Sequence, residues 1–350
     1  MAATVFRVGI TRDFLTAAGE LLFGREGLAL DLLDEAGIAY EFLPAGGPEI
    51  RPEWVRDYDG VLSLAPAWTA ASFQGLSRLA IIARYGVGYD MIDLAAATAA
   101  GVAVTITPDG VRRPVAVAEV TLILALTHRL MLKDRLVRAG RWEGKAGVPG
   151  LGLIGRTLGS LGVGNIGAEL FRLMRPFEMR HIAHDPYVRP ETAAELGVTL
   201  VDFETLLRES DVLCVNCPLT PETRGIIGAR ALALMKPTAY LVNTARGPIV
   251  DQPALTAALR EGRLAGAGLD VFEREPLPAD DPITRLDNVI LAPHALAWTD
   301  QLYRGNAASA ARALIAVARG EEPAVVVNRE VLSRPGWQAK LAAYRAGSRQ

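Results

Sequence analysis

Three polar residues in the second half of the sequence could perform acid–base chemistry on a small carboxylic acid. They are Arg246 in Asn-Thr-Ala-Arg-Gly, Glu275 in Phe-Glu-Arg-Glu-Pro and His294 in Ala-Pro-His-Ala. An arginine fork binds a carboxylate with two hydrogen bonds and stays charged. A histidine exchanges a proton near neutral pH, and a carboxylate partner fixes its tautomer. Taken alone, each of the three is also compatible with a polar loop residue that has no catalytic role.

A glycine-rich turn predicts a dinucleotide site. The spacing G-x-G-x-x-G occurs at Gly162, Gly164 and Gly167, and by itself it is weak because the chain has 34 glycines. Here an apolar strand pattern precedes the turn and an amphipathic helix pattern follows it. Gly162 then allows a tight turn, Gly164 a close approach of pyrophosphate, and Gly167 close packing of helix on strand. The start of the helix offers unpaired N–H groups to the phosphates.

Asp185 follows the glycine turn at about the 20 residues expected for the acid that binds the ribose. A carboxylate there accepts hydrogen bonds from both ribose hydroxyls and repels a 2′-phosphate, which favours NAD over NADP; nearby Arg189 weakens that preference. The alternative is a solvated turn residue before Pro186. Hydride transfer from NADH to a 2-oxo acid also needs a polarised carbonyl, a proton donor and a clamp for the carboxylate. Arg246 and His294 are candidates for these tasks.

Alternating strand and helix patterns must position these residues. We expect buried parallel strands at 5–10, 61–64, 79–83, 157–163, 180–184, 212–216, 239–243, 266–271 and 289–292. We expect helices at 27–36, 114–138, 251–262 and 307–319, and a glycine-rich loop over 144–152. The last helix could return to the first domain, and the polar tail over 332–350 is expected to end in a mobile segment. The fold class is therefore α/β, with two Rossmann-like, doubly wound parallel-sheet domains.

Composition narrows the class of partner. The chain has 350 residues, of which 50% are apolar and 22% charged, with a net charge of -2. No global charge favours nucleic acid or anionic membrane, and no signal peptide precedes the first strand. We therefore expect a cytoplasmic protein that binds small molecules. Cys214 and Cys217 match C-x-x-C, but residues three apart on a strand point to opposite faces and no second ligand pair follows, so we expect no metal or redox site.

Many segments in one order resemble the D-isomer-specific 2-hydroxyacid dehydrogenases, the family of 3-phosphoglycerate dehydrogenase and hydroxypyruvate/glyoxylate reductase. The resemblance covers roughly residues 5 to 330. The matching segments are Arg84-Tyr-Gly-Val-Gly-Tyr-Asp, Gly162-Val-Gly-Asn-Ile-Gly, His184-Asp-Pro, Pro218-Leu-Thr-Pro-Glu-Thr-Arg-Gly, Met235-Lys-Pro, Leu241-Val-Asn-Thr-Ala-Arg-Gly-Pro-Ile-Val-Asp, Gly268-Leu-Asp-Val-Phe-Glu-Arg-Glu-Pro-Leu and Pro293-His.

The resemblance implies a role for each matching residue. Arg246 would clamp the carboxylate and carbonyl, and His294 would be the general acid/base with Glu275 as its partner. The residues implied to bind NAD are Gly162, Gly164, Asn165, Ile166, Gly167, Asp185, Cys217, Pro218, Thr223, Thr244, Ala245 and Asp270. The residues implied to bind the substrate are Arg84, Val87, Gly88, Arg246 and His294. No metal is implied.

The family also implies a discontinuous substrate domain and a homodimer joined through the NAD-binding domains. We expect the substrate domain over 1–112 plus 297–350 and the NAD-binding Rossmann domain over 113–296, with an active-site cleft between them. The implied reaction moves a hydride between NAD(H) and C2 of a small D-2-hydroxy/2-oxo acid such as hydroxypyruvate, glyoxylate or phosphoglycerate.

Two departures and one alternative function stay open. Arg112 and Arg113 stand where many relatives carry small polar residues, so they are either a solvated loop pair or a site for a second anionic group of the substrate. Trp298 either lines the substrate pocket or packs in the core. His128, His181 and His184 are expected to be structural or surface residues.

The alternative to an enzyme is an NAD(H)-sensing corepressor of the same fold, although no docking extension is evident. The formate oxidisers of this fold have a Gln/His arrangement, which Arg246, Glu275 and His294 do not match.

Overall fold

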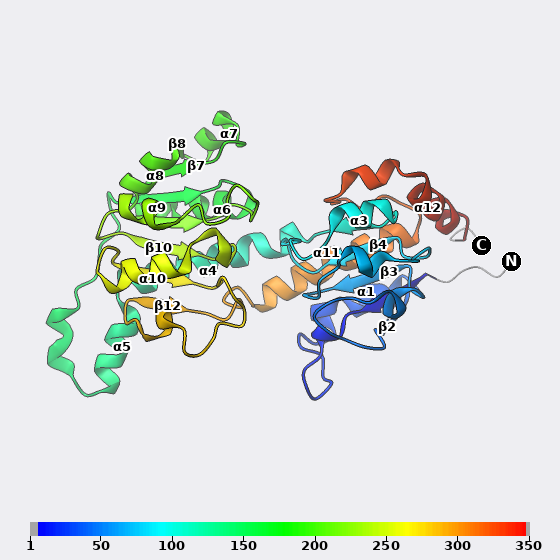
Figure 1. Ribbon diagram of the computed structural model, residues 1–350, viewed down its shortest axis with the longest axis horizontal. Coiled ribbons are helices and arrows are strands. Elements are labelled where there is room, and N and C mark those ends of the chain that lie inside the picture. The colour runs from blue at the N-terminus through cyan, green and yellow to red at the C-terminus, as the bar shows by residue number, and fades with distance from the viewer. Residues whose placement is uncertain (1–5, 348–350) are drawn as a thin grey trace. The chain divides into compact units, whose positions relative to one another are not determined.

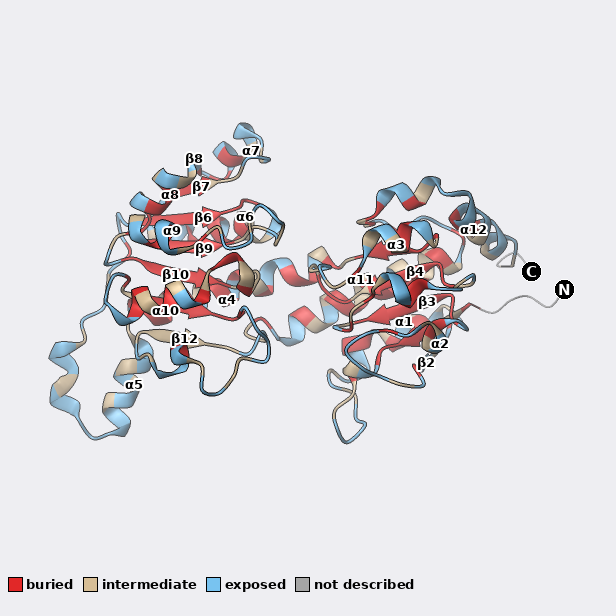
Figure 2. Ribbon diagram, in the orientation of Figure 1, coloured by how far each residue is buried: buried red, intermediate tan, exposed pale blue. Residues whose placement is uncertain are grey.

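The computed structural model describes residues 6–347, which divide into two compact units. Unit 1 comprises residues up to 111 together with those from 299 onward, and unit 2 comprises 112–298. The boundaries expected from the sequence are 112/113 and 296/297. Each unit has its own apolar core around an all-parallel sheet, whose central strands are buried in Figure 2. The predicted fold class is confirmed.

Unit 1 contains a five-stranded parallel sheet in the order β2-β1-β3-β4-β5. Its strands are β1 (Arg7–Ile10), β2 (Ala39–Phe42), β3 (Gly60–Ser63), β4 (Ile81–Arg84) and β5 (Ala103–Thr105). Its helices are α1 (Leu30–Glu35), α2 (Pro52–Val55), α3 (Leu94–Ala99), α11 (Asp300–Ala318) and α12 (Pro335–Gly347) (Figure 1). Strand order reverses between β1 and β3, as in doubly wound folds. Helix α11 packs on β4 and α1, so the C-terminal part of the chain completes the core of unit 1.

Unit 2 contains a seven-stranded parallel sheet in the order β12-β11-β10-β9-β6-β7-β8. Its strands are β6 (Thr157–Leu161), β7 (Arg180–His184), β8 (Thr199–Leu200), β9 (Val212–Val215), β10 (Tyr240–Asn243), β11 (Gly266–Leu269) and β12 (Val289–Leu291). Its helices are α4 (Pro108–Thr127, which begins in unit 1), α5 (Leu130–Arg138), α6 (Asn165–Met174), α7 (Pro190–Glu195), α8 (Phe203–Glu209), α9 (Ala229–Leu234) and α10 (Gln252–Arg260). Order reverses where β6 lies between β7 and β9, which places the glycine turn at the switch point.

The predicted single helix over 114–138 is wrong. Helix α4 starts six residues earlier, so Pro114 lies inside it, and it ends at Thr127. Arg129 takes a left-handed conformation (φ 53°), and α5 leaves at 58° to α4. A 3₁₀ helix follows at Trp142–Gly147 and overlaps the first residues of the glycine-rich loop predicted over 144–152. Within residues 6–347 no single helix is long and apolar enough to cross a membrane; only the bent pair α4 and α5 passes that test together.

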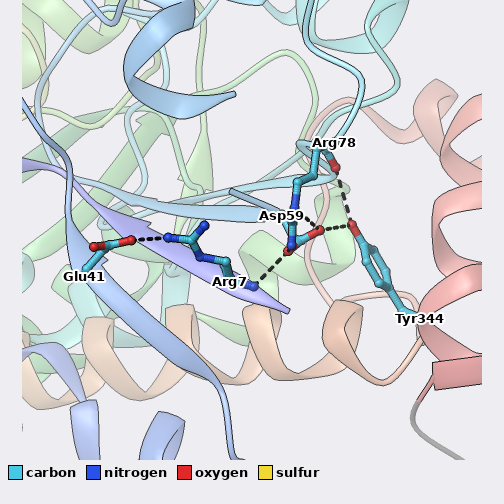
Figure 3. A network of polar contacts seen from close by, with 5 residues as sticks. All are labelled: Arg7, Glu41, Asp59, Arg78 and Tyr344. Atoms are coloured by element: carbon cyan, nitrogen blue, oxygen red, sulfur yellow. Dashed lines mark hydrogen bonds and ion pairs between the residues drawn. The ribbon is translucent and has the colours of Figure 1, made fainter. Parts of the chain in front are cut away.

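The polar tail predicted over 332–350 contains a docked helix that the sequence did not predict. Residues 335–347 form α12, and its Trp337 is fully buried and donates its indole N–H to the Ala80 carbonyl at 3.1 Å. Figure 3 shows a second attachment, in which the hydroxyl of Tyr344 donates to buried Asp59 at 2.9 Å. Asp59 also accepts two bonds from Arg78. One tryptophan in a polar segment was too weak a signal for a docked helix. The expected mobile end, residues 348–350, lies outside the described residues.

Smaller differences concern strand and helix limits. The predicted strand over 180–184 coincides with β7, whereas the one over 79–83 begins two residues later, at Ile81. The first residue of the strand predicted at 5–10 lies outside the described residues. Strands β2, β5 and β8 were not predicted, because they are short edge or partly exposed strands. Helix α11 begins at Asp300, where the Thr299 side chain caps it.

Candidate active site

The glycine turn has the geometry that a dinucleotide requires. Gly162 follows β6 with φ 100°, and a Cβ there would lie 2.8 Å from the Asn216 carbonyl oxygen. A Cβ at Gly167 would lie 2.6 Å from the Gly162 carbonyl oxygen, so the turn and α6 pack without room for a side chain. Gly164 opens onto free space at the N-terminus of the ten-residue helix α6. Free N–H groups and the helix dipole favour phosphate binding there.

Asp185 is built into the same turn. Its Oδ2 accepts the backbone N–H of Val163 at 2.8 Å, and its Oδ1 accepts those of Tyr187 and Val188 at 2.8 and 3.1 Å. These bonds fix the half-buried carboxylate at the end of β7, beside the glycine turn. A carboxylate has about four acceptor positions, so one remains for a further donor. The alternative of a merely solvated turn residue does not account for its bond to Val163.

Two loops at the carboxyl ends of β9 and β10 lie at the same sheet edge. After β9, the Thr223 hydroxyl donates to the Pro218 carbonyl at 2.6 Å and so holds the loop that contains half-buried Cys217. At the last residue of β10, the side chain of buried Asn243 accepts the N–H of Ala245 and donates to the carbonyl of Arg246, both at 3.0 Å. The loop that carries Thr244 and Arg246 is therefore fixed by a residue that sequence reasoning missed.

The Arg246 loop packs directly on the loop that carries Glu275. A Cβ at Gly247 would lie 1.9 Å from the carbonyl carbon and oxygen of Phe272, so only glycine fits. Phe272 in turn donates its backbone N–H to Glu275 Oε1 at 3.0 Å. This contact brings a guanidinium and a carboxylate from two strand ends into one group.

His294 completes this group. Its Nδ1 lies 2.7 Å from Glu275 Oε2, and the residue takes a left-handed backbone conformation (φ 56°), which is strained for a histidine. Asp270, at the end of β11, accepts the backbone N–H groups of Ala295 and Leu296 at 3.0 and 3.1 Å. These bonds hold the turn after His294 in place. Because Glu275 engages Nδ1, Nε2 is the nitrogen available to exchange a proton with a substrate.

The electrostatics agree with a charged partner for His294. Burial acts to raise the pKa of Glu275, but the hydrogen bonds from His294 and the Phe272 N–H outweigh it, and the nearby Arg246 charge adds to them, so the pKa lies below the ordinary value. Burial raises the pKa of Asp270, which the bonds from Leu296 and Ala295 only partly offset. Glu275 therefore stays ionised at neutral pH and can stabilise an imidazolium ring.

A second cluster, below the same sheet edge, was not predicted. Glu119 on α4 is fully buried, its Oε1 lies 2.8 Å from the Thr244 hydroxyl, and its Oε2 lies 3.4 Å from Asn216 Nδ2. Asn216 Nδ2 also donates to Ser160 Oγ at 3.1 Å. The sequence signal that could have indicated this cluster is Glu119 itself, an acidic residue within an otherwise apolar stretch of α4.

Comparison with known proteins agrees with this geometry. The model of the "D-isomer specific 2-hydroxyacid dehydrogenase, NAD binding domain" matches residues 120–295. A glyoxylate reductase of Korarchaeum cryptofilum is 45% identical over 293 residues, covering 82% of this chain and 88% of that protein. One of Thermococcus onnurineus is 44% identical over 300 residues, covering 83% and 89%. The chain belongs to the D-isomer specific 2-hydroxyacid dehydrogenase family.

Solved structures show the same architecture. A glyoxylate reductase from Paecilomyes thermophila superposes with a TM-score of 0.80 at 29% identity, covering 92% of this chain and 98% of that one. Membership in the family means that the chain is an NAD-dependent oxidoreductase of 2-hydroxy acids. Its own residues fit the cofactor, because the glycine turn leaves a cradle that a Cβ would fill and Asp185 stands beside it.

The predicted substrate residues of unit 1 lie at the carboxyl end of β4. Arg84 is the last residue of that strand, and half-buried Val87 and Gly88 follow it in a loop. The Arg84 guanidinium bonds to the Tyr85 carbonyl. Substrate binding by these three residues stays a prediction.

The arginine pair does not lie in a loop. Arg112 and Arg113 are on α4, and Arg113 forms an ion pair of 2.5 Å with buried Glu169. That bond lowers the pKa of Glu169. A role of the pair in binding a second substrate anion stays a prediction, which an unchanged KM for every acid in Arg112→Ala and Arg113→Ala would exclude. Trp298 is 43% exposed and belongs to neither core.

The remaining candidates have structural surroundings. Cys214 is buried on β9 and Cys217 follows the strand; burial raises the pKa of both thiols. No group of three or more His, Cys, Asp or Glu side chains arranged for a metal occurs within the part of the chain described. His181 packs on Phe171, and His184 contacts the Val201 carbonyl.

Proposed function

We propose that the protein reduces a small 2-oxo acid of the glyoxylate or hydroxypyruvate kind to the D-2-hydroxy acid with NADH. The observation that carries this proposal is the His294–Glu275 pair beside Arg246, at the sheet edge that also holds the glycine turn. The names of relatives at 45% and 44% identity support the choice of substrate.

Arg246, His294 and Glu275 have different roles in the proposed reaction. Arg246 binds the carboxylate and polarises the adjacent carbonyl, which raises the partial positive charge at C2. NADH, when bound, supplies the hydride that C2 accepts. His294 gives its Nε2 proton to the carbonyl oxygen, and Glu275 stabilises the imidazolium ring from which that proton comes. In the reverse direction, His294 removes the hydroxyl proton. We assign further substrate contacts to Arg84, Val87 and Gly88.

The test follows NADH oxidation with glyoxylate, hydroxypyruvate, pyruvate, oxaloacetate and 3-phosphohydroxypyruvate. We expect His294→Ala to lower kcat by about 10³-fold and Glu275→Gln by about 10²-fold, the usual range for general acid–base catalysis. His128→Ala, which changes an exposed histidine elsewhere in unit 2, is the matched control. Full turnover by His294→Ala would exclude the mechanism. Tight NADH binding without turnover of any acid would instead favour the sensor function.

The proposal includes a preference for NADH over NADPH, which the placement of Asp185 beside Val163 supports. Asp185→Asn keeps a hydrogen-bond acceptor but removes the charge that repels a 2′-phosphate. We expect the preference, measured as the ratio of kcat/KM values, to fall about tenfold. An unchanged ratio would assign the preference to other residues.

The proposal also includes a cytoplasmic location, for which the support is that both cysteines are unpaired. Cell fractionation tests it.

We also propose that the protein is a homodimer joined through the arm formed by residues 130–147. This arm comprises α5, of which no residue is buried, and the 3₁₀ helix after it, and it extends away from the sheet of unit 2 (Figures 1 and 2). Leu130, Val137 and Trp142 are 55%, 58% and 64% exposed. An ion pair of 2.5 Å between Arg135 and Asp287 holds α5 to the unit. An ordered arm with exposed apolar side chains is suited to a symmetric partner.

Light scattering tests the dimer. We expect the mass of two chains for the unmodified protein and of one chain for the double variant Val137→Asp with Trp142→Asp. Tyr187→Asp, at a side chain that is 92% exposed in another part of unit 2, should leave the mass unchanged. A single-chain mass for the unmodified protein, or a variant that stays dimeric, would remove the arm from the interface.

A further inference from the structure

Glu119 is a buried acid of unit 2 that the reaction above does not use. It lies in the middle of α4 among apolar neighbours such as Ala116, Leu122 and Ile123, and it is fully shielded from solvent. An ionised carboxylate in such a place is costly unless a cation or several strong donors compensate it. The two groups that hydrogen-bond to it, Thr244 and Asn216, are both neutral.

The contacts of Glu119 reach three strand ends at the cofactor edge of the sheet. Through Oε1 it holds Thr244, the first residue after β10. Through Oε2 it contacts Asn216, the first residue after β9. Asn216 continues to Ser160 on β6, and the Ser160 hydroxyl donates to the Gly162 carbonyl at 2.7 Å. A single buried side chain thus connects the glycine turn with the loop of the catalytic arginine.

We propose that Glu119 is a positioning residue that acts as a neutral carboxylic acid and thereby orients the Thr244 hydroxyl toward the bound nicotinamide cofactor. Across the 2.8 Å contact, a Glu119 carboxylate accepts the Thr244 hydrogen, and its other oxygen accepts from Asn216. As a neutral acid, Glu119 would instead donate its own proton to Thr244 Oγ1 and keep the bond from Asn216. The hydroxyl hydrogen of half-buried Thr244 is then available to another acceptor, such as one on the cofactor. As a carboxylate, Glu119 would accept the hydrogen bond from the Thr244 hydroxyl, which could then not donate to the cofactor.

The surroundings favour the neutral form. Burial raises the pKa of Glu119 to about 8, although the bonds from Thr244 and Asn216 act in the opposite direction. The titratable group that faces it from the sheet is the Cys214 thiol on β9, whose pKa is also raised by burial. Asp270 stands at the end of the neighbouring strand β11, and the charged residues of α4 itself lie near its start, at Asp109, Arg112 and Arg113.

The consequence is a cofactor affinity that depends on pH without involving His294. Below about pH 8 the acid is neutral and Thr244 can donate to the cofactor; above it, ionisation withdraws that donor. Losing one hydrogen bond to a ligand weakens binding by about tenfold. The inference rests on the cofactor site of the proposed function, not on the identity of the oxo acid.

The test measures the Kd for NADH by fluorescence titration between pH 6 and 9, with no oxo acid present. We expect wild-type Kd to rise about tenfold across this range. Glu119→Gln, whose amide donates and accepts at every pH, should show a Kd within about threefold of the low-pH wild type and no rise. Glu119→Leu should bind about tenfold more weakly at all pH values, and Thr244→Val likewise, without additivity in the double variant.

The outcomes separate the possibilities. A Glu119→Gln profile that rises in parallel with wild type overturns the proposal, because the pH dependence then belongs to another group. Additive effects of Glu119→Leu and Thr244→Val also overturn it. Should Glu119→Leu fail to fold, the Gln and Val variants alone decide. Because no substrate enters these titrations, a wrong oxo acid would leave the result unchanged, whereas the turnover panel tests that assignment separately.

Discussion

Buried Glu119 should make the free energy of unfolding of the protein depend on pH. The pKa of Glu119 is raised from 4.5 to about 8 in the folded state, so between these values the folded protein binds more protons than the unfolded chain. The stabilisation from this group is complete below about pH 4.5, declines as pH rises, and is fully lost above about pH 8. We expect the free energy of unfolding of wild type, relative to Glu119→Gln, to fall by roughly 1 kcal/mol per pH unit in that window.

Denaturant unfolding of the cofactor-free protein at pH 5, 6, 7 and 8 measures this difference. A difference that stays constant with pH would mean that Glu119 is ionised in the folded state. Glu169→Gln is a useful contrast, because Arg113 lowers the pKa of that carboxyl and the sign is opposite. Its stabilising contribution is present above the ordinary glutamate pKa and is lost only in acid.

Residue chemistry was the most predictable level. Arg246, Glu275 and His294 could be proposed from type and motif, and the structure places Glu275 within 2.7 Å of His294. Asn243 and Glu119 could not, since their roles depend on bonds to residues far along the chain or in a loop whose path is not evident from the sequence. Their roles therefore required the folded structure.

At the scale of elements, the catalytic group depends on two loops that pack without space between them. A methyl group at Gly247 would lie 1.9 Å from the Phe272 carbonyl carbon, so one of the two loops must shift. We expect Gly247→Ala to lower kcat/KM by at least about 10²-fold, because a displacement of about 1 Å in positioning is enough for such a loss. Gly152→Ala, where a Cβ meets no atom within 4 Å, should retain full activity. Steady-state kinetics with glyoxylate compares the two.

The same scale shows why some elements were predictable and others not. Central strands such as β9 and β10 are fully buried and are largely apolar runs in the sequence. The break between α4 and α5 lies at Arg129, a residue that gives no local signal for a left-handed conformation. Helix α12 has the sequence of a polar tail because most of its side chains face solvent, and only Trp337 and Leu341 are buried.

At the scale of the whole molecule, the chain forms two cores that should respond to different substitutions. Trp337 is fully buried in the core of unit 1, whereas Phe171 is fully buried in that of unit 2. Replacing a buried large aromatic by alanine costs about 3–5 kcal/mol. The NAD binding domain lies in unit 2, so NADH should stabilise that unit by an amount that grows with the logarithm of its concentration above Kd.

Calorimetry with and without NADH distinguishes the two cores. We expect Trp337→Ala to lower the stability of unit 1 by about 3–5 kcal/mol while the Kd for NADH stays within about twofold of wild type. Phe171→Ala should destabilise unit 2 to a similar extent and weaken NADH binding, because Phe171 lies on α6, the helix whose N-terminus follows the glycine turn. If both variants weakened NADH binding equally, α12 would have to support the cofactor site as well, and the two cores would form one cooperative folding unit.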